Sequence, residues 1–173
     1  MQKPEELETR WLLAARSRLR LELQGLAFAV SRGATPQEYA RFLWSRGAAA
    51  WMGADCADAD SYLLKEAAAM AALFPWVRVD TVRMTTRQAE LVISGGCLGG
   101  YGEDRWALAR GLGLERTTVC RYCSEAFNVW GKQLGLEVAC HAQRDGACKL
   151  QATKLGQETT PSTSPANLTL KSD

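Results

Sequence analysis

The sequence has no long hydrophobic run and no strong charge of either sign. No stretch approaches the roughly 18–20 consecutive apolar residues of a membrane-spanning helix, so we expect no membrane segment. The net charge is only +2, which argues against a nucleic-acid-binding surface. The first residues are charged and lack the apolar core of a signal peptide. These absences together predict a cytoplasmic protein.

Histidine is nearly absent too, and no phosphate-binding motif is found. His141 is the only imidazole, and its place next to Cys140 makes it a candidate catalytic acid or base. A solvent-exposed strand histidine is the simpler interpretation. The glycine-rich loop at 94–102 lacks both the Gly-Lys-Ser/Thr ending and the dinucleotide-binding spacing, so we do not expect phosphate binding there.

What the sequence has is clear periodicity of two kinds. Helical spacing of apolar residues predicts helices at about 5–30, from Pro36 to near Gly53, and at about 58–73. Thr35-Pro36-Gln37-Glu38 is typical of a capping box with proline in the first turn. Alternating residues predict hairpins at 77–93 and 136–153. Between the hairpins we expect a short helix at about 104–112 and a longer one, capped by Thr117 or Thr118, that ends near Gly135.

This order of elements predicts the fold class. We expect an α+β domain at 1–155, in which an N-terminal layer of three helices packs on an antiparallel sheet made of two hairpins in ββαββ order. The Ser/Thr/Pro-rich segment at 156–173 is predicted to be a disordered tail. Exposed sheet edges would allow a homodimer.

Four of the six cysteines are expected to converge. Cys120 and Cys123 begin an apolar stripe on the long helix, at its N-terminal end, where the helix dipole favours thiolates. Cys140 and Cys148 are separated by an even number of residues around a hairpin turn, so both should point to the core face of the sheet. Glu137 and His141 should lie on the opposite face.

Two interpretations of these cysteines stay open. Four converging thiolates could hold zinc or iron, although the spacing of the second pair is not that of a zinc knuckle. Reduced cysteine is also a common core residue, and packing alone could explain each of them. Cys56 is expected to be structural, whereas Cys97 lies in the glycine-rich loop, where backbone can approach a ligand closely.

The stretch from Cys97 to Leu150 resembles the L-2-amino-thiazoline-4-carboxylate hydrolase family. The shared features are a cysteine after a strand, the "LARGLGL" segment, Cys120-Arg121-Tyr122-Cys123 and a hairpin that ends in Gly146-Ala147-Cys148. The hairpin is also similar to the 4-vinyl reductase type ligand-binding domain, in which glutamate and cysteines hold a structural zinc beside a pocket for small hydrophobic ligands. The resemblance marks as site residues Cys97, Cys120, Cys123, Cys140, Cys148 and Glu137.

Three functions follow as hypotheses. The first is a hydrolase-like enzyme for a small sulfur- or nitrogen-containing molecule, with a cysteine thiolate or a metal-bound water as the nucleophile. Its catalytic candidates are Cys97, Cys120, Cys123 and His141. The second is a non-enzymatic ligand-binding or sensor domain with a structural zinc at Cys120, Cys123, Cys140, Cys148 and Glu137. The third is a metal or metalloid carrier.

Overall fold

A computed structural model describes residues 4–46, 56–74, 77–94, 105–143 and 146–156. The chain is an α+β protein with a four-stranded antiparallel sheet, in agreement with the predicted class. Its helices are α1 (Pro4–Ser31), α2 (Pro36–Trp44), α4 (Ala59–Leu73), α5 (Arg105–Gly111) and α6 (Arg116–Gln133). Its strands are β1 (Arg78–Met84), β2 (Gln88–Ser94), β3 (Leu136–Ala142) and β4 (Cys148–Lys154).

The local signals explain where several elements begin and end. The predicted capping box starts α2, because the Thr35 hydroxyl accepts from the Glu38 amide and the Glu38 carboxylate accepts from the Thr35 amide. The helix ends at Trp44, however, so the prediction that it reaches Gly53 is wrong. Helix α6 is preceded by Glu115 rather than capped by a threonine.

The sheet has the strand order β1-β2-β4-β3, so the two hairpins lie side by side through β2 and β4. The register sets Leu91 opposite Leu150, and Val138 opposite Ala152. Because side chains alternate along each strand, these residues share one face, which is buried. The other face carries polar residues, including the ion pair of Lys149 with Glu90 at 2.7 Å. Among the described residues, helices therefore cover the sheet on one side only.

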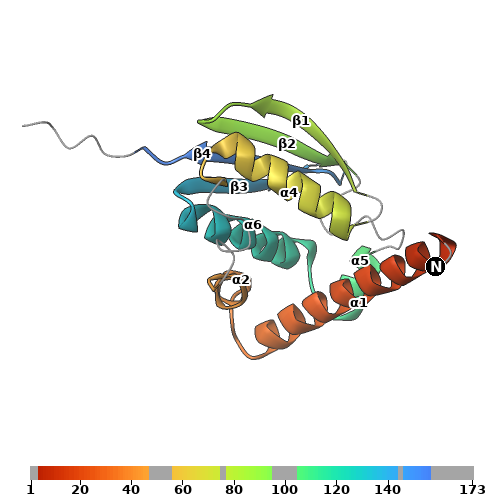
Figure 1. Ribbon diagram of the computed structural model, residues 1–173. Coiled ribbons are helices and arrows are strands. Elements are labelled where there is room, and N and C mark those ends of the chain that lie inside the picture. Colours follow the sequence, from red (N-terminus) through yellow and green to blue (C-terminus); the bar gives the residue numbers. More distant parts are fainter. Residues whose placement is uncertain (1–3, 47–55, 75–76, 95–104, 144–145, 157–173) are drawn as a thin grey trace, which may run out of the picture.

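Two helices cover the buried face. Helix α4 contacts β1, β2 and β4, and α6 lies along β3, as Figure 1 shows. Their apolar side chains meet those of the strands in one core cluster. From α4 it includes Tyr62, Leu63 and Met70, and Phe127 and Trp130 of α6 pack against it.

Helices α1 and α2 do not lie on the sheet, which corrects the expected layer of three N-terminal helices. They pack on the side of α6 that faces away from β3 (Figure 1). A second core forms there, with Leu19, Leu23 and Leu26 of α1 against Tyr122 and Cys123 of α6. The sheet face is already filled by α4 and α6, so the first two helices form a further layer on α6.

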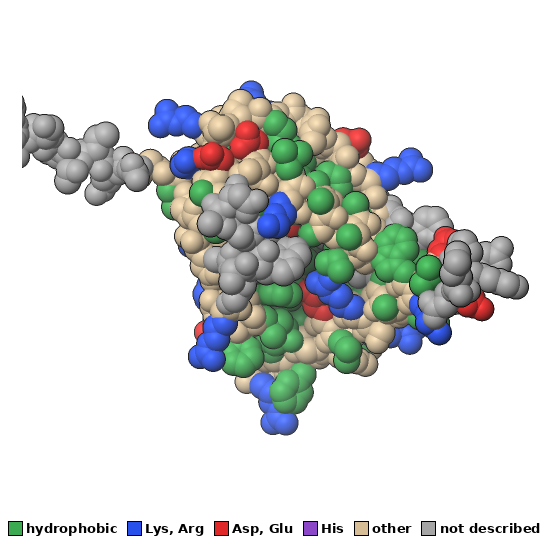
Figure 2. Space-filling model, in the orientation of Figure 1, with side chains coloured by type: hydrophobic (Ala, Val, Ile, Leu, Met, Phe, Trp, Pro, Cys, Tyr) green, Lys and Arg blue, Asp and Glu red, His purple; other side chains and the backbone are tan. Residues whose placement is uncertain are grey.

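The outer surface mixes charge and apolar groups. Figure 2 shows Lys, Arg, Asp and Glu side chains scattered among hydrophobic ones, without a continuous patch of one sign on the face in view. Several large apolar side chains of α1 and α2 are exposed, with Leu21 at 68% and Phe42 at 79% exposure.

The close approach of α6 to β3 depends on Gly131. A Cβ atom at this buried position would run into the Val138 side chain and lie 3.2 Å from the Leu136 carbonyl oxygen. We expect Gly131→Ala to lower the free energy of unfolding by about 1–2 kcal/mol, because the overpacking cost exceeds the gain in helix propensity. Urea denaturation measures the change.

Gly111→Ala is the matched control. Gly111 ends α5, and a Cβ atom there would have nothing within 4 Å. This variant should stay within about 0.5 kcal/mol of the wild type. Equal losses in the two variants would contradict the proposed role of Gly131.

Candidate functional site

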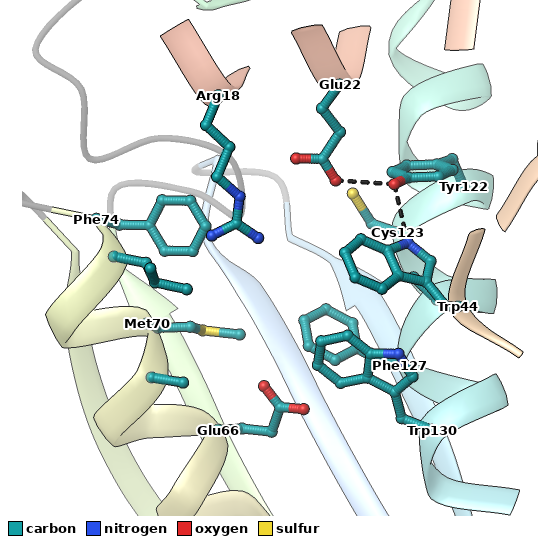
Figure 3. A pocket seen from close by; sticks show the side chains of 13 residues that line it. Arg18, Glu22, Trp44, Glu66, Met70, Phe74, Tyr122, Cys123, Phe127 and Trp130 are labelled. Atoms are coloured by element: carbon teal, nitrogen blue, oxygen red, sulfur yellow. Dashed lines mark hydrogen bonds between the residues drawn. The ribbon is translucent and has the colours of Figure 1, made fainter. Parts of the chain in front are cut away.

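A cavity of about 80 Å³ lies between α4 and α6. Helices α4 and α6 form its sides, and residues of α1 and α2 line it where it faces away from the sheet (Figure 3). Most of its wall is apolar, but two carboxylates, one guanidinium and one thiol also reach it. The lining residues are Arg18, Glu22, Trp44, Glu66, Ala69, Met70, Leu73, Phe74, Tyr122, Cys123, Ala126, Phe127 and Trp130.

The most unusual of these side chains is Glu66. It is 2% exposed, and its Oε1 atom is buried with no hydrogen-bond partner. Burial raises the pKa of Glu66 from 4.5 to about 7, and the nearby Tyr62 hydroxyl opposes this shift only in part. Native proteins rarely leave a buried carboxyl oxygen unsatisfied. Glu66 also lines the cavity, so its carboxyl group is the candidate hydrogen-bond partner for a ligand there.

Hydrogen bonds centred on Tyr122 join α1, α2 and α6 beside the cavity. The Tyr122 hydroxyl donates to Glu22 Oε1 at 2.8 Å and accepts from Trp44 Nε1 at 3.0 Å (Figure 3). Burial, with a further contribution from the Glu22 carboxylate, raises the pKa of Tyr122, so the phenol stays neutral. These hydrogen bonds therefore fix α1, α2 and α6 in position and leave Tyr122 no role as an anion near neutral pH.

Aromatic rings line the wall of the cavity. Trp44 and Trp130 meet edge to face, with ring centroids 5.1 Å apart, and Phe127 meets Trp130 in the same way at 6.3 Å. Figure 3 shows the Glu66 carboxylate, which comes from α4, at the same end of the cavity as Phe127 and Trp130 of α6. An acid beside several aromatic faces is the usual environment of a bound organic cation.

Arg18 brings a positive charge to the cavity from α1. Its guanidinium lies 5.6 Å from the centre of the Phe74 ring. In Figure 3 the Arg18 and Glu66 side chains enter from different helices, with Met70 between them in the view. The cavity thus has an acidic group from α4, Glu66, and both a basic group, Arg18, and an acidic group, Glu22, from α1.

The structure separates the predicted cysteines into two places. Cys123 is buried and lines the cavity. Cys140 and Cys148 lie on the core face of the second hairpin, with their sulfur atoms 3.0 Å apart, as their even spacing predicts. Cys120 is half-buried near the start of α6. The predicted site at Cys97 lies outside the described residues.

Glu137 and His141 lie on the open face of the sheet. Both are exposed, and they alternate along β3 with Val138 and Cys140 of the core face. This agrees with the expected alternation, and it directs both side chains away from Cys140 and Cys148. The resemblance-based role of Glu137 as a ligand beside these thiols, and an acid–base role of His141 at Cys140, do not fit this placement.

The positions of the described side chains also bear on the predicted metal site. Within the described ranges, no three His, Cys, Asp or Glu side chains are placed so that they could hold a metal ion. As positioned, the predicted ligands Cys120, Cys123, Cys140, Cys148 and Glu137 therefore do not fit a zinc or iron site. Metal binding by this protein stays a prediction.

Sequence reasoning did not identify Glu66, although the sequence carried a signal for it. The apolar stripe of α4 runs through Tyr62, Leu63 and Met70, and Glu66 falls on that stripe at helical spacing. A carboxylate on the apolar side of an amphipathic helix is a candidate buried acid. No comparable signal marks Arg18 or Glu22, since α1 has charged residues on several sides.

Comparison with known proteins adds no relative: no family model matches the chain, and neither do the curated proteins or the solved structures. In the part of the chain that the structure describes, none of the helices has the length and apolar character to cross a bilayer. The function is therefore argued from the geometry of the cavity.

The buried state of Glu66 predicts a pH dependence of stability. Between pH 4.5 and about 7 the unfolded chain has released the Glu66 proton, whereas the folded protein still holds it. Stability therefore falls as the pH rises through this range, by about 3 kcal/mol in total, and this contribution changes little above it. Glu66→Gln removes the titration, so its stability relative to the wild type should rise by that amount. Urea unfolding at several pH values measures it.

Glu137→Gln is the control, because it removes an exposed carboxyl on the open face of the sheet. A pH-dependent difference of the same size in Glu137→Gln would show that the effect is not specific to the buried acid. If the Glu66→Gln profile ran parallel to that of the wild type, the buried acid would not have the assigned pKa.

Proposed function

We propose that this protein binds a small organic molecule that carries a basic nitrogen, in the cavity between α4 and α6. The observation that carries the proposal is Glu66, a buried carboxylate with an unpartnered oxygen in an otherwise apolar wall. Binding an amine or amidine would give that oxygen a charge-assisted hydrogen bond. This would offset the cost of burying the carboxylate.

The aromatic wall supports a cationic ligand rather than a neutral one. Phe127, Trp130 and Trp44 lie at the cavity in edge-to-face contact. Aromatic faces attract cations, and the attraction grows when the cation is removed from water. A neutral apolar ligand would gain from the same wall but would offer the Glu66 carboxyl group no further hydrogen bond.

Arg18 supports a second feature of the ligand. Its guanidinium reaches the cavity from α1 and can take a carboxylate. A small amphoteric molecule could then place its nitrogen at Glu66 and its acid group at Arg18. The cavity volume of about 80 Å³ limits the enclosed part to a few non-hydrogen atoms.

Hydrolysis is a second candidate function, because Cys123 lines the same cavity as Glu66. The Cys123 thiolate would attack an electrophilic carbon of the bound molecule, and Glu66, with a pKa of about 7, would give a proton to the leaving group as its bond to that carbon breaks. A water molecule, deprotonated by Glu66, would then attack the same carbon and release it from Cys123. This is in line with the resemblance to the amino-thiazoline carboxylate hydrolase family. A zinc or iron cofactor, a homodimer and a cytoplasmic location stay predictions.

Three probes of equal chain length test the binding proposal. We expect n-butylamine to bind more tightly than n-butanol by about 10- to 100-fold, the value of one buried charged hydrogen bond, and more tightly than n-butyrate, which cannot pair with the Glu66 carboxylate. Trp44 and Trp130 line the cavity, so their fluorescence reports binding. Affinity for the amine should rise as the pH increases through about 7, because Glu66 must ionise.

Glu66→Gln provides the matched control. It should remove both the preference for the amine and its pH dependence, and leave butanol binding within about threefold of the wild type. Equal affinity of wild type and variant for the amine would overturn the proposal.

The hydrolase candidate is tested with 2-amino-thiazoline-4-carboxylate, which combines a basic nitrogen with a carboxylate. We expect product formation by the wild type and a loss of at least about 100-fold in Cys123→Ser, because a hydroxyl is a much weaker nucleophile. Liquid chromatography with mass detection measures the product. Activity that survives in Cys123→Ser would exclude this thiol as the nucleophile.

A further inference from the structure

A second pair of reactive groups lies on the second hairpin. The sulfur atoms of Cys140 and Cys148 are 3.0 Å apart. This is closer than the roughly 3.5–4.0 Å at which non-bonded carbon atoms pack. Ordinary filling of a core does not require two thiols to be this close, so the contact points to chemistry between them.

The register of β3 and β4 explains the contact. Cys140 is opposite Leu150 and Cys148 is opposite Ala142, so the cysteines are diagonal neighbours on one face of the hairpin. A disulfide bond is about 2.0 Å long, so closing it brings the sulfur atoms about 1 Å closer. Because diagonal neighbours usually lie about 7–8 Å apart along the backbone, the two strands must also approach each other slightly at this point. Cys148 is the first residue of β4, and Cys140 lies three residues before Gln143, the first residue after β3. Both cysteines are therefore close to the end of the hairpin, where the strands can move more easily than in the middle of the sheet.

The two thiols differ in access to solvent. Cys148 is buried, at 2% exposure, whereas Cys140 is half-buried. A reagent in solution therefore reaches Cys140 first, and Cys148 is placed to react with the product. This is the arrangement of an attacking and a resolving cysteine.

We propose that Cys140 and Cys148 form a reversible redox site that closes to a disulfide by exchange with a small disulfide such as oxidised glutathione. The Cys140 thiolate attacks one sulfur of the reagent, and a glutathione thiolate leaves and takes up a proton. The Cys148 thiolate then attacks the Cys140 sulfur of the mixed disulfide and releases the second glutathione. The protein loses two protons and two electrons, and the reagent takes them up to become two thiols.

This site is independent of the proposed ligand cavity. Neither cysteine lines that cavity, and the exchange needs neither Glu66 nor Cys123. Cys148 belongs to the core cluster that includes Met70, and Cys140 and Trp130 pack against that cluster.

The full-length protein, reduced and then incubated with excess oxidised glutathione under native conditions, tests the proposal. After acid quenching, alkylation and tryptic digestion without reductant, the peptides 133–144 and 145–149 separate unless a disulfide joins them. We expect the joined pair to be the main product, with a mass lower by two hydrogen atoms than the sum of the two reduced peptides. Subsequent dithiothreitol should restore the separate peptides.

Two variants serve as controls for this experiment. Cys120→Ser should still give the joined pair to the same extent, which excludes a bond from the other half-buried cysteine of this region. Cys140→Ser should give no joined pair and leave Cys148 largely unmodified, because the buried thiol is not the first to react. The proposal is overturned if both peptides are alkylated separately, if a mixed glutathione disulfide persists on Cys140, or if Cys120 is the partner.

Discussion

The sheet has one apolar face that needs cover, and a single helix is too narrow to cover it. Strands usually lie about 4.8 Å apart and a helix with its side chains is about 10–12 Å wide, so four strands need two helices. Helices α4 and α6 meet this need, α4 over β1, β2 and β4 and α6 over β3. A space that neither helix fills lies between the two. Here that space is the cavity, and α1 and α2 bring further side chains to it.

Helix α6 links the two cores of the protein. Phe127, Trp130 and Leu134 pack against the sheet cluster, whereas Val119, Tyr122 and Cys123 belong to the cluster with α1 and α2. Its contact with β3 is close because Gly131 has no side chain. The hydrogen bonds of Tyr122 with Glu22 and Trp44 then fix where α1 and α2 lie on α6. The hydrogen bonds of Tyr122 and the close packing at Gly131, both on α6, thus position the walls of the cavity.

The sequence was sufficient for features that depend on local periodicity. The hairpins, the capping box at Thr35 and the shared face of Cys140 and Cys148 all follow from spacing of two or of three to four residues. The sequence was not sufficient for features that depend on which helix packs against the sheet and which helix packs against another helix. Cys123 was placed with the hairpin cysteines because both sets face a core, but α6 is buried on two sides and Cys123 faces the other cluster. The spacing of apolar residues along the sequence does not show that one helix packs against two separate cores.

The same limit explains why Glu66 was missed and why it matters. Helix propensity tolerates glutamate at any interior position, so the cost of Glu66 arises only when tertiary packing removes it from water. A hydrophobic side chain of similar size at this position would avoid that cost and would fill the space beside Met70 and Phe127. A protein that retains a carboxylate there accepts a lower stability at neutral pH, where Glu66 must either hold a proton or be buried with a charge. A cationic ligand pairs with that charge, so the buried carboxylate contributes to affinity instead of only lowering stability. The proposed binding function therefore rests on Glu66 rather than on the cysteines.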